Sequence, residues 1–131
     1  MKRSVVVLLF FAFVCAPLLG AAGYVKSGNN IVFVFNGAGA TGTIRMVNVA
    51  GSFNGWDPKL ANWKMAKQGR NWVLGLSKAA IKRFKRGTSG KYEFKFVVNK
   101  TQWIQLAPAV PNKADDGNGG FNYIILDADL Q

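Results

Sequence analysis

The sequence contains no histidine, and its single cysteine, Cys15, lies near the N-terminus. Without histidine the chain lacks the commonest general base, any Ser-His or Cys-His nucleophile pair and the usual zinc ligands. The residues from 23 onwards contain no cysteine, so packing rather than disulfides must stabilise them. We therefore expect a protein that is not an enzyme and that holds no metal or other cofactor.

Acidic residues are also scarce, with 6 Asp and Glu against 17 Lys and Arg. When Lys2 and Arg3 in the N-terminal segment are left out, 15 basic residues remain against 6 acidic ones, a net charge of +9. Such a surplus favours loose attraction to polyanions. Two of the acids, Asp115 and Asp116, are neighbours in a glycine-rich stretch. We expect them to be solvated turn formers, because a calcium loop needs more oxygen ligands at regular spacing.

The N-terminal residues are typical of a secretory signal. Lys2 and Arg3 precede an apolar run at 5–14, and small residues follow at 20–22. The run is too short to span a membrane as a helix.

We expect cleavage after Ala21 or Ala22, so that residues 1–22 form a signal peptide and residues 23–131 form one exported domain, periplasmic or secreted. Two alternatives stay open: the segment is kept as a membrane anchor, or the protein is a lipoprotein acylated at Cys15.

From residue 23 onwards, short apolar runs alternate with turn signals, and no stretch keeps a helical period for three turns. This pattern predicts an all-β domain. Strands are expected at 31–35, 43–50, 64–66, 71–76, 91–98 and 123–126, with an irregular stretch at 99–121. About seven short strands in a domain of roughly this size are typical of an immunoglobulin-like β-sandwich.

The segment KYEFKFVV, residues 91–98, is the clearest strand. Its residues alternate with period two, so that the face containing Tyr92, Phe94 and Phe96 is expected to point into the core. Lys95 then points away from the core.

The segment SKAAIKRFKRG, residues 77–87, is predicted to be a basic helical turn anchored by Ile81 and Phe84. Its exposed cations are Lys82, Arg83, Lys85 and Arg86. They form either a solvated cap or a weak contact for an anionic polymer or lipid headgroups.

Three separated motifs carry a resemblance to a known family: GSFNGWDP at 51–58, KYEFKFVVNKTQW at 91–103 and DDGNGGFNYIIL at 115–126. Together they resemble the glycogen-binding domain of the AMP-activated protein kinase β subunit and the related family-48 carbohydrate-binding modules. The resemblance implies an early-set immunoglobulin-like β-sandwich. It also implies non-catalytic binding of α-1,4-linked glucan such as glycogen, starch or maltodextrin.

The resemblance also implies a set of binding residues. Trp56 and Trp103 match the two tryptophans that stack on glucose rings, while Lys95 and Asn122 match the lysine and asparagine that bond sugar hydroxyls. An exposed indole suits the apolar C–H face of a pyranose, and a few polar groups suit its rim. We expect weak binding, with a Kd of roughly 0.1 to 1 mM.

The motifs also depart from the family pattern. Asn118 stands in place of a leucine that props the glucan, Gly120 in place of a threonine, and one extra residue occurs near Lys100 and Thr101. A second hypothesis is accordingly an envelope protein-interaction module that keeps the fold without sugar binding. No nucleic-acid partner is expected.

The other two tryptophans match no binding residue. We expect Trp72 to face the core, and we leave Trp63 open between core and surface.

Overall fold

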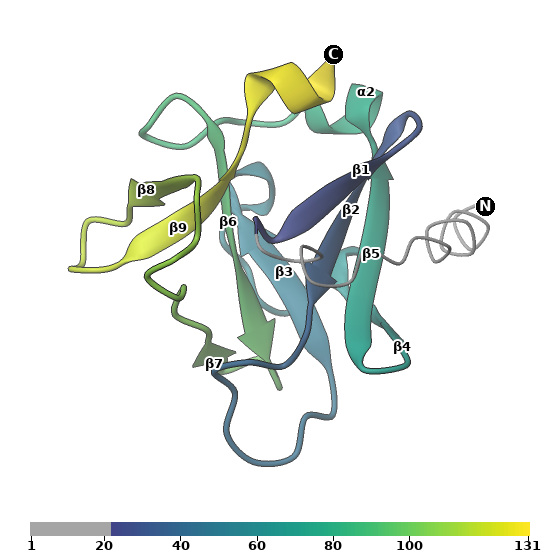
Figure 1. Ribbon diagram of the computed structural model, residues 1–131, viewed down its shortest axis with the longest axis vertical. Helices are drawn as coiled ribbons and strands as arrows, with labels where there is room; N and C mark the ends of the chain where they lie inside the picture. The colour runs from purple at the N-terminus through teal and green to yellow at the C-terminus, as the bar shows by residue number, and fades with distance from the viewer. Residues whose placement is uncertain (1–21) are drawn as a thin grey trace.

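The computed structural model describes residues 22–131, which fold into two antiparallel β-sheets packed as a sandwich (Figure 1). The first sheet has the strand order β1-β2-β5-β4 and the second β3-β6-β9-β8, with β7 also paired to β6. The first sheet consists of β1 (Tyr24–Ser27), β2 (Asn30–Phe35), β5 (Asn71–Ser77) and β4 (Ala66–Gln68). The second consists of β3 (Val47–Gly51), β6 (Tyr92–Val98), β9 (Phe121–Ile125), β8 (Lys113–Asp115) and β7 (Gln102–Trp103). The predicted all-β sandwich is confirmed.

Helical structure in the described residues is confined to single turns. They are the α-helical turn α2 (Lys78–Ile81) and the 3-10 turns η3 (Ser52–Asn54), η4 (Ala61–Trp63) and η5 (Asp127–Leu130). In residues 22–131, no helix has the length and apolar character needed to cross a membrane. The predicted signal peptide, except for its last residue, lies outside the described residues.

Aromatic side chains from both sheets fill the core. Phe33 of β2 meets Phe94 of β6 with ring centroids 4.9 Å apart, and Phe35 lies 5.1 Å from Phe96. The inward face predicted for β6 is therefore confirmed. Trp72 is buried, also as predicted.

Trp63, left open by the sequence, belongs to the core. Its indole stacks on the ring of Phe53 with centroids 4.7 Å apart and planes inclined by only 2°. Phe84 packs against both rings from the segment after α2, and Ile81 is fully buried. The two predicted anchors of the basic turn are thus confirmed.

The strand predicted at 43–50 begins only at Val47. The side chain of Asn99 replaces the β-ladder for the preceding residues: its Oδ1 accepts hydrogen bonds from the backbone N–H groups of Arg45 and Met46, and its Nδ2 donates to the carbonyl of Thr43. β6 ends at Val98 because Asn99 and Lys100 both adopt positive φ angles, 52° and 67°, in the turn that leads to β7. Pairing between β3 and β6 therefore stops at Val47 and Val98.

The stretch at 99–121 is not irregular throughout, because it contains β7 and β8. The final strand starts at Phe121, not at Tyr123, so Asn122 lies inside the strand. β1 was also not predicted. The three strands that the sequence did not predict are short, with 4 residues in β1, 2 in β7 and 3 in β8. Each of them pairs with a longer neighbouring strand.

Candidate functional site

A groove of about 990 Å³ lies over the outer face of the second sheet. Because Phe94 and Phe96 of β6 point into the core, their neighbours Glu93 and Lys95 point to the outer face. The groove is lined by all four residues that the family resemblance singled out, namely Trp56, Lys95, Trp103 and Asn122. Residues from separate parts of the sequence are thereby brought to one surface.

Trp56 is held by a cross-linked turn that follows β3. The Asn54 side chain accepts a hydrogen bond from Gly51 N at 2.9 Å and donates one to Val49 O at 3.0 Å. The backbone N–H of Trp56 donates to Gly51 O at 2.9 Å. Trp56 itself adopts φ 59°, a left-handed conformation that disfavours a large side chain by about 1 to 2 kcal/mol. The turn therefore fixes a half-buried indole in a strained position at the groove.

Trp103 comes to the same groove from β7. It pairs with Val97 of β6, so its side chain shares the outer face with Lys95, and the residue is 38% exposed. The rings of Trp56 and Trp103 lie with centroids 6.5 Å apart and planes inclined by 38°. The turn with the extra residue, closed by a hydrogen bond from Thr101 N to Val98 O, thus leaves Trp103 beside Trp56.

Lys95 is not a free surface lysine. Its Nζ lies 2.8 Å from Asp116 Oδ2, and both side chains are only 9% exposed. Asp116 Oδ1 accepts two further hydrogen bonds, from the backbone N–H groups of Asn118 and Gly120. The hydrogen bond from Lys95, followed by these two N–H groups, lowers the pKa of Asp116 to about 2. Asp116 thus shapes the turn as expected, but the expectation that it is solvated was wrong. Asp115 is exposed and caps the turn at Gly117 N.

Asn122 is buried at the floor of the groove, and its Nδ2 donates a hydrogen bond to Glu93 Oε1 at 3.0 Å. Glu93 is itself only 3% exposed, and its Oε2 accepts from Ser89 N at 2.8 Å. A Cβ atom at Gly87 would collide with the Glu93 carboxylate, so the glycine makes room for it. Sequence reasoning missed Glu93 as a groove residue. The available signal was its position two residues before Lys95 on the same face of the strand.

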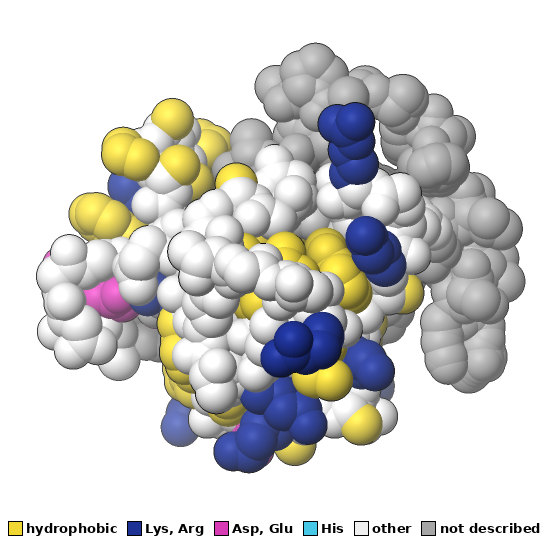
Figure 2. Space-filling model, turned by 90° about the horizontal axis from the view of Figure 1, so that it is seen from below, with side chains coloured by type: hydrophobic (Ala, Val, Ile, Leu, Met, Phe, Trp, Pro, Cys, Tyr) yellow, Lys and Arg dark blue, Asp and Glu magenta, His cyan; other side chains and the backbone are white. Residues whose placement is uncertain are grey.

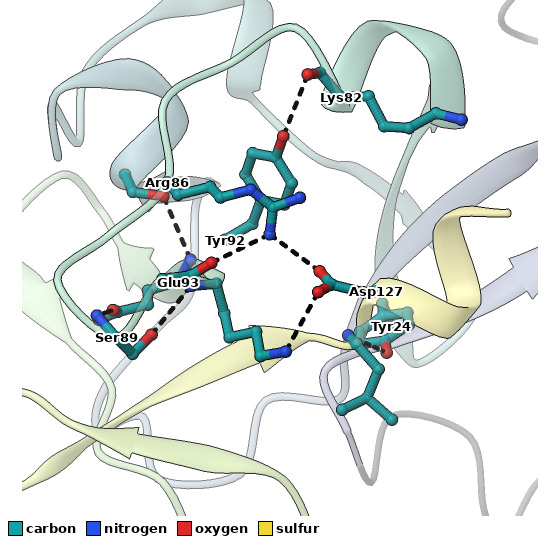
Figure 3. Close-up of polar contacts among 11 residues, drawn as sticks. Tyr24, Lys82, Arg86, Ser89, Tyr92, Glu93 and Asp127 are labelled. Atoms are coloured by element: carbon teal, nitrogen blue, oxygen red, sulfur yellow. Dashed lines mark hydrogen bonds and ion pairs between the residues drawn. The ribbon is translucent and has the colours of Figure 1, made fainter.

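Residues 85–88 form another wall of the groove. A polar network around Arg86, Tyr92 and Asp127 holds this wall in place (Figure 3). Arg86 Nη1 donates to Asp127 Oδ1 at 2.9 Å and to Gly90 O at 3.0 Å, while its guanidinium lies 4.4 Å from the centre of the Tyr92 ring. Lys91 Nζ contacts the other oxygen of Asp127 at 3.2 Å. Hydrogen bonds from Arg86 and then Lys91 hold the pKa of Asp127 below its usual range.

Of the four cations predicted to contact an anionic partner, Arg86 already forms an ion pair with Asp127. Lys82, Arg83 and Lys85 are exposed, and no carboxylate of residues 22–131 forms an ion pair with them.

Charge in the groove is balanced although the protein is strongly basic. Its lining contains three cationic side chains and three carboxylates: Lys85, Arg86 and Lys95, and Glu93, Asp115 and Asp116. By contrast, Figure 2 shows dark blue Lys and Arg side chains spread over one end of the sandwich, where little magenta is visible. The basic surplus of the protein thus lies outside the groove.

Two departures from the family pattern also lie at the groove, since Asn118 and Gly120 line the wall formed by the β8–β9 loop. In the part of the chain that the structure describes, no three His, Cys, Asp or Glu side chains gather as ligands of a metal ion would. No protein-family model matches the chain, and no curated protein matches it either.

Proposed function

We propose that this protein binds α-1,4-linked glucan, such as glycogen, starch or maltodextrin, in the groove and does not cleave it. We further propose that the sandwich is of the early-set immunoglobulin-like type found in family-48 carbohydrate-binding modules. The observation that carries it is the pair of indoles at Trp56 and Trp103, 6.5 Å apart and tilted by 38° at one groove.

The two tilted rings suit a curved chain of pyranoses. Successive glucose units in an α-1,4-glucan are inclined to each other, so two inclined indoles can each cover the C–H face of one unit. If each ring covers roughly 50 Å² of sugar, the pair contributes about 2.5 kcal/mol. Trp56 is already fixed by its turn, so little additional order is required when the sugar binds.

The floor of the groove retains polar capacity for sugar hydroxyls. The Lys95 ammonium has three N–H donors, of which one faces Asp116, and Asn122 keeps its carbonyl oxygen while its amide N–H faces Glu93. Two or three hydrogen bonds at about 1 kcal/mol each add to the stacking, and ordering losses reduce the total. The resulting Kd is roughly 0.1 to 1 mM.

The charge balance of the groove favours an uncharged ligand. An acidic polysaccharide would meet the carboxylates of Glu93 and Asp115 as well as the ammonium of Lys85. A neutral glucan avoids that repulsion. Its binding should therefore change little between about 50 and 200 mM salt, whereas attachment to a polyanion would weaken strongly.

Calorimetric or NMR titration with maltoheptaose tests the proposal, with the β-1,4-linked cellohexaose as the control sugar. We expect binding of maltoheptaose alone and its loss in the double variant Trp56→Ala, Trp103→Ala. No response at about 10 mM sugar, or full binding by the double variant, would contradict the proposal. In that case, co-purification of a partner protein that survives amylase treatment would favour the interaction module.

A second candidate function is weak attachment to an anionic surface. It is supported by the exposed cations Lys82, Arg83 and Lys85, which have no carboxylate partner within residues 22–131. Sedimentation with vesicles containing phosphatidylglycerol tests it, and reversal of all three charges should abolish sedimentation. Unchanged sedimentation of that variant would exclude this surface as the contact.

We further propose that the protein is exported, with residues 1–22 acting as the signal peptide. N-terminal sequencing of the protein recovered outside the cytoplasm should begin at Ala22 or Gly23. Recovery of a chain that still begins at Met1 would refute cleavage.

A further inference from the structure

The loop between β8 and β9, residues 116–120, forms one wall of the groove. Gly117 and Gly119 in this loop have φ angles of 82° and 89°, a backbone shape that glycine adopts freely. The ends of the loop are held by the β8–β9 pairing and by a hydrogen bond from Asp116 N to Gly120 O at 3.0 Å. β8 does not pair with β6, so the contact of the loop with β6 must come from side chains.

Asp116 and Lys95 provide that contact. Asp116 Oδ1 accepts from the N–H groups of Asn118 at 2.7 Å and Gly120 at 3.0 Å, which shapes the loop. Its Oδ2 accepts from Lys95 Nζ at 2.8 Å, and this is the hydrogen bond that joins the loop to β6 in residues 22–131. Both side chains are 9% exposed, so the pair is shielded from water and salt.

We propose that Lys95 is a positioning residue that holds the loop at 116–120 as a wall of the groove, and that Asp116 determines glucan binding as strongly as Lys95 does. This inference rests on the proposed function. It assigns a role to Asp116, which the sequence motifs did not identify as a binding residue. Asn118, exposed on this wall, is presented to the ligand only while the pair is intact.

If donation to the sugar were the only role of Lys95, Asp116 would behave in the opposite way. If the ammonium served chiefly as a hydrogen-bond donor to the sugar, Asp116 would compete with the ligand for it. Replacing Asp116 by asparagine would then free Lys95 and leave the affinity unchanged or higher. If the pair holds the wall, the same replacement weakens binding. The sign of the change therefore separates the two roles.

The first experiment is a double-mutant cycle with maltoheptaose, using Lys95→Met, Asp116→Asn and the double variant. We expect each single variant to raise Kd roughly tenfold. The Kd of the double variant should not exceed the higher of the two single-variant values, because the pair acts as one unit. Lys95→Arg, which keeps the ion pair, should retain most of the affinity. Lys26→Met, which removes the ion pair with Asp129 outside the groove, is the matched control and should bind as the wild type does.

Two results would overturn the inference in this experiment. One is wild-type or tighter binding by Asp116→Asn together with loss of binding in Lys95→Met. The other is a double variant whose loss equals the product of the two single losses, because independent roles multiply in Kd.

The second experiment needs no ligand. Amide hydrogen exchange at Gly120 and Asn118, whose N–H groups donate to Asp116, should accelerate at least severalfold in Lys95→Met while amides in the β2–β5 pairing stay protected. Unchanged exchange at both positions would overturn the positioning role. If the wild-type protein binds no glucan, the proposed function fails, and this exchange measurement still decides whether Lys95 holds the loop.

Discussion

Trp56 and Trp103 lie beside each other at one groove, with ring centroids 6.5 Å apart and planes inclined by 38°. Trp56 arrives there on the turn after β3, and Trp103 arrives on β7, which pairs with β6. Because β3 and β6 are neighbouring strands, the turn after β3 and the strand β7 reach the same groove.

The two rings should contribute separately to glucan binding. Trp56→Ala and Trp103→Ala should each raise the Kd for maltoheptaose roughly tenfold, because each removes about half of the stacked area. Quenching or enhancement of tryptophan fluorescence during titration measures this. Leu60→Ala is the control, since Leu60 is a 38% exposed apolar side chain outside the groove lining. An equal loss in that variant would mean that the effect is not specific to the indoles.

Trp56→Gly should be more stable than Trp56→Ala by about 1 kcal/mol, although both variants lack the indole. The backbone at Trp56 has φ 59°, which glycine adopts without strain and alanine does not. Urea unfolding of the two variants measures the difference. Equal midpoints would show that the turn relaxes around alanine.

Truncation of Trp63 should cost much more stability than truncation of Trp103. Trp63 stacks on Phe53 in the core, so Trp63→Ala should lower the free energy of unfolding by about 3 to 5 kcal/mol. Trp103 is 38% exposed, and Trp103→Ala should change stability by less than about 1 kcal/mol. Thermal unfolding followed by circular dichroism checks both. A large loss from Trp103→Ala would mean that its main role is structural.

Acid should weaken the contribution of the Lys95–Asp116 pair. The pKa of Asp116 falls from an ordinary 3.8 to about 2 in the folded protein, so its stabilising effect is complete above about pH 5. It is lost as pH falls from there through about 2, where the folded state also becomes protonated. The difference in unfolding midpoint between the wild type and Asp116→Asn should therefore shrink between pH 5 and pH 2. A difference that stays constant over this range would contradict the lowered pKa.

Gly87→Ala should destabilise the protein by about 1 to 3 kcal/mol, because the new Cβ atom would collide with the buried Glu93 carboxylate. Glu93→Ala removes that carboxylate, so the extra loss from Gly87→Ala should largely vanish in a Glu93→Ala background. Chemical unfolding of the two single variants and the double variant measures the coupling. If the two losses in stability simply add, Glu93 is not the residue with which the new Cβ atom collides.

The sequence predicted the long strands and the core aromatics well. β6 alternates aromatic and polar residues from Tyr92 to Phe96, and the hairpin around Gln68 and Gly69 has a clear turn signal. The short strands β1, β7 and β8 were missed, because so few residues carry no periodic pattern and depend on a neighbouring strand for pairing. Residues 43–46 were wrongly predicted to be a strand. Their sequence suits a strand, but the Asn99 side chain forms hydrogen bonds with the backbone of Thr43, Arg45 and Met46.

The four predicted binding residues line one groove, but the sequence did not indicate their partners. The pairing of Lys95 with Asp116 and of Asn122 with Glu93 joins residues that are distant along the chain. No local pattern can identify such pairs, because they depend on which strands are neighbours and on how a glycine-rich loop folds back over them.

Local pattern was therefore sufficient for the β-rich fold, since period-two alternation and turn residues act over a few neighbours. The two candidate binding tryptophans, Trp56 and Trp103, came from the resemblance to a known family. Tertiary contacts settled the rest. They placed Trp63 in the core, set Trp103 beside Trp56, and buried Lys95 against Asp116. These outcomes depend on contacts made across the sheets, where burial and charge pairing, rather than the character of a single residue, determine what a side chain does.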